Sequence, residues 1–184
     1  LQQIQSREGL MALMAEVSLL LDQKNYKAAS EAMAKLVALP EGKKPHHLRE
    51  YLMILEHLED FETALDVVKE WKLLTPGDEA VWLREADLLV RADQMEAAIR
   101  ETRRAVVKFE DEKAVEEKLA ELYSMSGNIA EAKRIYWRML DEAEGTDEAL
   151  SYVNKLADIS RQTGEIAELI QQFVANVVNH TNTS

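Results

Sequence analysis

Histidine and carboxylate side chains are the first candidates for chemistry, because they supply general bases and metal ligands. The chain has four histidines: His46, His47, His57 and His180. His46 and Glu50 fall on one face of an expected helix, and His57 follows further along it. Ligands from a single helix do not converge on a metal ion without a second element, and the HExxH spacing of zinc enzymes is absent. The sequence therefore predicts no metal site.

Nucleophile and cofactor motifs are missing as well. The chain has no cysteine, so it offers no thiolate for catalysis or for metal binding. It contains no P-loop, no GxGxxG and no GxSxG sequence. Carboxylates are plentiful, but no pattern marks any of them as buried or paired. We therefore predict no catalytic residue, no cofactor and no enzymatic activity in this chain.

Composition narrows the remaining classes of function. A formal net charge of -12 disfavours nucleic acid as a partner, because phosphate binding needs clustered Lys and Arg. No apolar run reaches the roughly 18 residues of a membrane span, so we expect no direct membrane insertion. Hydrophobic residues make up 47% of the chain, which indicates a folded domain, and only 6 Gly and 3 Pro interrupt it. This composition favours long helices.

A short motif recurs along the chain at a nearly constant interval. A large apolar residue is followed three residues later by a small or apolar one, and the large residues are Tyr26, Phe61, Met95, Ile129 and Ile166. Each segment is expected to open a helix, with larger side chains four and seven residues beyond the small one on the same face. The small residues, where two helices must approach closely, are Ala29, Ala64, Ala98 and Ala132. The intervals are 35, 34, 34 and 37 residues, and the last implies an insertion near residues 144–147.

With this period, residues 10 to about 180 resemble the tetratricopeptide repeat family. The third unit matches best, with Trp82 and Ala86 in its first helix and Ala98 and Ala105 in its second. The resemblance implies an all-α fold, a right-handed superhelical α-solenoid of antiparallel helix hairpins. We expect a single repeat domain over 1–184, with units near 10–44, 45–78, 79–112, 113–149 and 150–180. Because the chain starts at Leu1, we also expect it to be a segment of a longer protein.

The resemblance also implies where a partner binds. In the family, the first helices of the hairpins line a concave surface that holds a peptide or a partner helix. Projection onto this chain gives the candidate residues Arg49, Met53, His57, Leu83, Asp87, Arg91, Glu117, Glu121 and Asp158. The surface would be acidic toward its C-terminal end, so we expect a protein or peptide partner with basic and apolar features. The function predicted is a non-catalytic scaffold for protein–protein interaction.

Two alternatives remain open from the sequence. Met11 and Met14 could make an apolar end that stacks on another copy or on further repeats, which would make the chain a structural or self-association segment. The chain could instead be the regulatory domain of an enzyme whose catalytic part lies elsewhere. The compartment is not encoded, and cytoplasm and periplasm are both compatible with the sequence.

Overall fold

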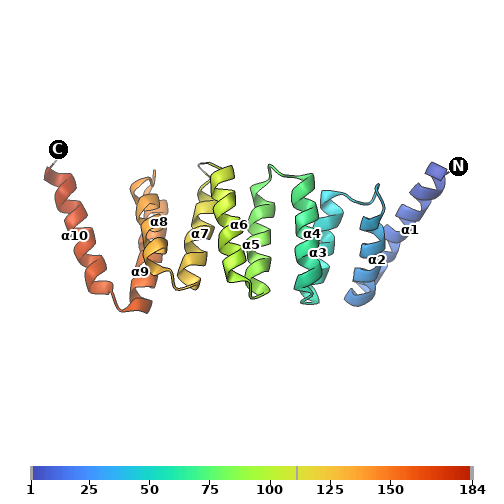
Figure 1. Ribbon diagram of the computed structural model, residues 1–184, viewed down its shortest axis with the longest axis horizontal. Helices are drawn as coiled ribbons and strands as arrows, with labels where there is room; N and C mark the ends of the chain where they lie inside the picture. Colours follow the sequence, from blue (N-terminus) through green and yellow to red (C-terminus); the bar gives the residue numbers. More distant parts are fainter. Residues whose placement is uncertain (1, 111, 183–184) are drawn as a thin grey trace. The chain divides into compact units, whose positions relative to one another are not determined.

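The computed structural model describes residues 2–110 and 112–182, with side chains described for 8–110 and 112–175. The described ranges contain helices and connecting turns and no strand (Figure 1). The helices are α1 (Gln2–Asp22), α2 (Tyr26–Ala38), α3 (Pro45–His57), α4 (Phe61–Leu74), α5 (Glu79–Arg91), α6 (Met95–Lys108), α7 (Lys113–Met125), α8 (Ile129–Asp141), α9 (Thr146–Thr163) and α10 (Ile166–Asn182). The predicted all-α fold of antiparallel hairpins is confirmed.

The chain divides into two compact units, residues 1–105 and residues 106–184, and the boundary falls within the last turn of α6. In the first unit, α1 packs on α2, α2 on α3, α3 on α4 and α4 on α5. In the second unit, α7 packs on α8, α8 on α9 and α9 on α10. Each unit is therefore built by neighbours along the chain, as in a repeat protein. The expectation of one domain over the whole chain stays a prediction.

The same backbone turn closes all five hairpins. At each turn one residue takes the left-handed conformation, and the following N–H donates to the carbonyl five residues earlier. These bonds are Asn25 to Leu20, Asp60 to Leu55, Gln94 to Leu89, Asn128 to Tyr123 and Glu165 to Ser160, at 2.8–3.0 Å. This is the Schellman arrangement, which satisfies carbonyls at the end of the first helix and reverses the chain. In the last two hairpins the left-handed residues are Gly127 and Gly164, with φ values of 80° and 76°.

Glycine occupies the left-handed position in only the last two hairpins. In the first three, Lys24, Glu59 and Asp93 take φ values of 56°, 58° and 58°. A side chain with a Cβ is strained in this region, by roughly 1–2 kcal/mol per residue. The surrounding hydrogen bonds hold these residues there nonetheless.

Small buried residues allow the helices of a hairpin to approach closely. Ala29, Ala64, Ala98 and Ala132 each have no exposed surface, as the motif predicts. The positions four and seven residues further along are also buried, namely Met33 and Leu36, Val68 and Trp71, Thr102 and Ala105, and Tyr136 and Met139. The repeating motif therefore marks the buried stripe of α2, α4, α6 and α8.

Side-chain caps fix where several helices start. Asn25 and Asp60 accept hydrogen bonds from the N–H groups three residues on, at 3.3 and 3.2 Å. Asp78 accepts one from Ala80 N at 3.1 Å and so caps the start of α5. The extra residues near 144–147 lie partly inside a helix, because α9 begins at Thr146 and has 18 residues where α3, α5 and α7 have 13.

The turn geometry yields a test of stability. We expect Glu59→Gly to raise the free energy of unfolding by about 0.5–1 kcal/mol, because glycine relieves the strain and offsets its own entropy cost. Gly127→Ala should lower it by about 1 kcal/mol, because alanine must take a φ of 80°. Chemical denaturation measures both changes.

Gly77→Ala is the matched control for these variants. Gly77 has no positive φ and a Cβ there would meet no atom within 4 Å, so its stability should stay within about 0.5 kcal/mol of the parent. Equal effects of Gly127→Ala and Gly77→Ala would contradict the role given to the left-handed turn.

Candidate functional site

The sequence-predicted residues of the first unit lie on α3 and α5. Arg49, Met53 and His57 follow one another at four-residue spacing on α3, and all three are exposed. Met53 exposes 58% of its surface, so an apolar side chain is available on this face. On α5, Leu83 and Asp87 are half-buried and Arg91 is exposed. The first helices of these two hairpins therefore present an accessible face that mixes cationic and apolar groups.

Glu56 ties α3 to α5 beside this face. Its carboxylate accepts a hydrogen bond from Arg84 at 2.5 Å and lies 3.4 Å from the Arg91 guanidinium. Arg91 also lies over the Phe61 ring, 4.7 Å from its centroid. The His57 ring packs against the Tyr26 ring, with centroids 3.7 Å apart. Arg91 and His57 are therefore held by intramolecular contacts, and a partner would meet them in fixed positions.

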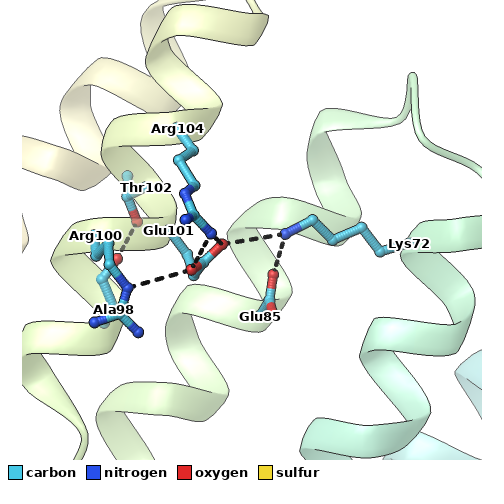
Figure 2. A network of polar contacts seen from close by, with 7 residues as sticks. All are labelled: Lys72, Glu85, Ala98, Arg100, Glu101, Thr102 and Arg104. Atoms are coloured by element: carbon cyan, nitrogen blue, oxygen red, sulfur yellow. Dashed lines mark hydrogen bonds and ion pairs between the residues drawn. The ribbon is translucent and has the colours of Figure 1, made fainter.

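A second ionic network lies between α4, α5 and α6 of the first unit (Figure 2). Figure 2 shows Lys72 extending from α4 to the carboxylates of Glu85 and Glu101. The Lys72 Nζ lies 2.5 Å from Glu85, 3.7 Å from Glu101 and 3.3 Å from the centroid of the Trp82 ring. Glu101 also binds Arg100 and Arg104, at 3.6 and 2.9 Å. Because Glu85 is only 4% exposed, Lys72 neutralises a buried carboxylate, and this network is structural.

The predicted residues of the second unit are Glu117 and Glu121 on α7 and Asp158 on α9. The two glutamates are half-buried and Asp158 is exposed. Lys155 of α9 lies 3.6 Å from Glu117 and 3.0 Å from Glu121, and Lys118 lies 3.3 Å from Glu121. Asp158 pairs with Arg161 at 2.6 Å. Each of these carboxylates has a cationic partner, so this face is less negative than the count of its carboxylates suggests.

A pocket of about 210 Å³ opens between α7 and α9 next to this cluster. Glu121, Lys155 and Asp158 line it together with Met125 and the buried Tyr136. Ser124, Ile159 and Gln162 complete the lining. Met125 is 61% exposed, so the pocket has an apolar side chain available for contact. Two of the nine predicted residues, Glu121 and Asp158, thus meet at one concave feature.

The electrostatics of this pocket are set by burial and by Lys155. Burial opposes ionisation of Glu121, but the hydrogen bond from Lys155 and the charge of Lys118 outweigh it and lower the pKa of the Glu121 carboxyl. Burial, reinforced by Glu121 and Glu117, raises the pKa of the Tyr136 hydroxyl well above its usual range. Tyr136 therefore stays protonated, and its hydroxyl can both donate and accept a hydrogen bond.

Sequence reasoning missed several residues of these faces, namely Glu56, Arg84, Lys118, Tyr136, Lys155 and Gln162. For some of these residues, the sequence contains a spacing that predicts their ion pairs. Glu56 and Arg91 are 35 residues apart, and Glu121 and Lys155 are 34 apart, so each pair joins equivalent helices of successive hairpins. Opposite charges one repeat period apart therefore predict an ion pair.

Among the described residues, no group of three or more His, Asp or Glu side chains is placed to hold a metal ion. No helix in the described part of the chain combines the length and apolar character that crossing a membrane requires.

The Lys72 network predicts a strong coupling in stability. Lys72→Met should lower the free energy of unfolding by roughly 2–4 kcal/mol, because it leaves the buried Glu85 carboxylate without its cation. The double variant Lys72→Met, Glu85→Leu should regain most of that loss, as a denaturation-based mutant cycle would show. Lys69→Met, on the exposed side of the same helix, should change stability by less than about 1 kcal/mol. A double variant no more stable than Lys72→Met alone would contradict the assignment.

The lowered pKa of the Glu121 carboxyl predicts how the stability of the fold changes with pH. Its folded pKa lies below the ordinary value of 4.5, so it stabilises the fold above that pH, and the stabilisation is lost as the pH falls through the lowered pKa. Lys155→Met should raise the Glu121 midpoint in a carboxyl-carbon NMR titration. Lys133→Met, which leaves this cluster untouched, should not move the Glu121 midpoint. An unchanged midpoint in Lys155→Met would show that Lys155 does not hold Glu121 ionised.

Solved structures of known proteins share this architecture, although sequence comparisons find no match. No protein-family model matches the sequence, and no curated protein matches it. Solved structures match over most of the chain at low sequence identity. A tetratricopeptide repeat protein from Parabacteroides merdae has a TM-score of 0.65 at 12% identity, over 92% of this chain and 67% of its own. MamA from Desulfovibrio magneticus RS-1 has a TM-score of 0.63 at 14% identity, over 95% and 96%.

A third match is a putative kinesin light chain with nearly identical TPR-like repeats from Podosopora anserina, with a TM-score of 0.62 at 16% identity, over 97% of this chain and 98% of that one. At these identities the likeness concerns the fold. The stacked hairpins, the period near 34 residues and these structural matches agree, and the chain has the fold of the tetratricopeptide repeat proteins.

Proposed function

We propose that this chain is a non-catalytic scaffold that binds another protein through the first helices of its hairpins. The observation that carries the proposal is the pocket between α7 and α9, where the exposed Met125 adjoins the Glu121–Lys155 pair. An apolar surface next to oriented polar groups is the usual composition of a binding site for a peptide side chain. The tetratricopeptide fold supports the same proposal, because its repeats typically present binding surfaces.

In the second unit, the proposed mode of binding is insertion of one apolar side chain of the partner between α7 and α9. The Ile159 and Met125 side chains would contact it, and the Tyr136 hydroxyl and Gln162 amide would hydrogen-bond to the adjacent backbone. Glu121 and Asp158 line this pocket and Glu117 pairs with Lys155 beside it, so a basic residue next to the apolar one fits the local charge. The two cations already present, Lys155 and Arg161, limit how much this charge contributes.

In the first unit, the proposed contact face is the accessible face of α3 and α5. It consists of the residues predicted from the sequence: Arg49, Met53, His57, Leu83, Asp87 and Arg91. Met53 is its largest exposed apolar group, and the ion pairs of Glu56 hold Arg91 in place. Side chains that are already fixed lose little entropy on binding, which favours affinity.

Self-association is the second candidate, and one observation favours it. Met11, Met14 and Leu19 of α1 are 62%, 44% and 58% exposed, so this helix carries apolar groups that its own hairpin does not cover. If α1 pairs with another copy, sedimentation velocity should show dimers that grow with concentration and that Met14→Glu abolishes. A monomer at all concentrations would remove this candidate.

The scaffold proposal is tested by affinity capture with matched charge variants. The test variant Met53→Glu, Met125→Glu alters the first helices, and the control Leu73→Glu, Val107→Glu alters the second helices. All four residues are at least 58% exposed, so both variants should fold, and both add two negative charges. Each protein serves as bait in a lysate of its source organism, with folding checked by circular dichroism.

We expect the unaltered protein and the control to capture the same specific partner. The test variant should capture about tenfold less of that partner, or none. Loss of the partner only in the control would move the binding surface to α4 and α6 and contradict the proposal. Capture of no specific partner by any of the three proteins would also count against it.

A further inference from the structure

His47 has a polar atom that the fold leaves without a partner. The residue is 5% exposed, and its Nδ1 lies 2.7 Å from the carbonyl oxygen of Gly42. A carbonyl oxygen can only accept, so Nδ1 carries the proton and donates this bond. In the neutral ring Nε2 is then an acceptor, and it has no hydrogen-bond partner among the described residues. A buried acceptor left in this state is costly, so a donor that reaches it would be bound favourably.

The position of the His47 ring is tightly constrained. A Cβ at Gly42 would come within 2.0 Å of the Leu36 carbonyl oxygen, so the loop before α3 lies directly against the end of α2. The hydrogen bond to Gly42 ties the ring to this loop. Nε2 therefore has one fixed direction, as a binding site requires.

A pocket of about 200 Å³ adjoins His47 where α1, α2 and α3 meet. Its inner wall is apolar, with Val17, Met33 and Leu36 all buried. Its rim carries Met14, which is 44% exposed, and the half-buried Glu50. The exposed Ser18 also lines it, so the pocket combines an apolar wall with the Glu50 carboxylate and the Ser18 hydroxyl, and it adjoins the shielded His47 Nε2.

We propose that this pocket binds an aliphatic primary ammonium group, such as the side chain of a lysine on a partner protein. The methylene stem would lie against Met33 and Leu36, and the ammonium would donate to His47 Nε2 and face the Glu50 carboxylate. An ammonium group has three donors and no acceptor, which suits the His47 Nε2, the Glu50 carboxylate and the Ser18 hydroxyl, since each of these can accept a hydrogen bond. The net charge of -12 favours a cation over an anion at this site.

The ligand must move part of the rim to reach Nε2, because that atom is shielded from solvent. Met14 is suited to this movement, since it is partly exposed, unbranched and free to change rotamer. The site uses none of the nine residues predicted from the sequence. It depends on the proposed scaffold function only in naming a partner's lysine as the natural ligand, and the test below does not need that partner.

The test uses n-butylammonium as the probe and n-butyltrimethylammonium as its matched control, which has the same charge but no N–H donor. The readout is the methyl ¹³C spectrum of the methionines in the intact chain. We expect the Met14 and Met33 signals to shift saturably with n-butylammonium only. The signals of Met53 and Met125, which do not line this pocket, should stay in place and report non-specific effects.

Two variants separate the parts of the site. His47→Asn can keep a donor near the Nδ1 position for the Gly42 carbonyl and removes the Nε2 acceptor, so it should abolish the saturable shift. Glu50→Gln removes the charge from a half-buried rim residue and should weaken n-butylammonium binding by roughly tenfold even if His47→Asn does not fold.

Three results would overturn the proposal: no saturable shift, equal shifts from both ammonium probes, or full binding by a folded His47→Asn variant. The scaffold test alters Met53 and Met125, which take no part in this site. Failure of the ammonium proposal would therefore leave the scaffold proposal standing, and failure of the scaffold proposal would leave the ammonium proposal standing.

Discussion

The Schellman turn that ends each first helix is the constraint on which the rest of this structure depends. A hydrogen bond spanning five residues reverses the chain in the same way five times, which brings the residue three positions after the start of the second helix to the inner side of each hairpin. Where that residue is alanine, it is completely buried in all four cases. Equivalent residues of successive hairpins then recur at the repeat period, so the pattern of the core follows from the pattern of the turns.

The same regularity organises the charges. Glu56 with Arg91, Lys113 with Glu148 and Glu121 with Lys155 each join first helices one period apart, and Lys133 joins α8 to Glu165 in the turn before α10. Exposed pairs of this kind contribute little to stability individually. Their effect is to fix the direction of long side chains on the faces that a partner would contact. Lys72 differs, because it neutralises a nearly buried carboxylate and so contributes mainly to the fold.

Sequence patterns predicted the architecture well, because each hairpin depends on local rules. The anchors from Tyr26 to Ile166 marked the start of every second helix. The left-handed conformation of Lys24, Glu59 and Asp93 was not predicted, because glycine is the residue that adopts it without strain. The hydrogen bonds of the turn hold these three residues in that conformation. The pocket beside His47 was less predictable. Nothing in the residue types around His47 indicates that Nδ1 donates to the Gly42 carbonyl while Nε2 has no hydrogen-bond partner among the described residues. That depends on packing among three helices, which composition and period do not encode.

We propose that α3 and α5 of the first unit, and α7 and α9 of the second, each present a surface that a protein partner contacts. Hydrogen–deuterium exchange of the chain alone and with its captured partner tests this claim most directly. Partner binding should slow amide exchange in peptides from these first helices, most strongly around Met125 and Ile159 beside the pocket. Exchange in α4, α6 and α8 should stay nearly unchanged. Slowed exchange confined to those second helices, with the first helices unaffected, would contradict the account.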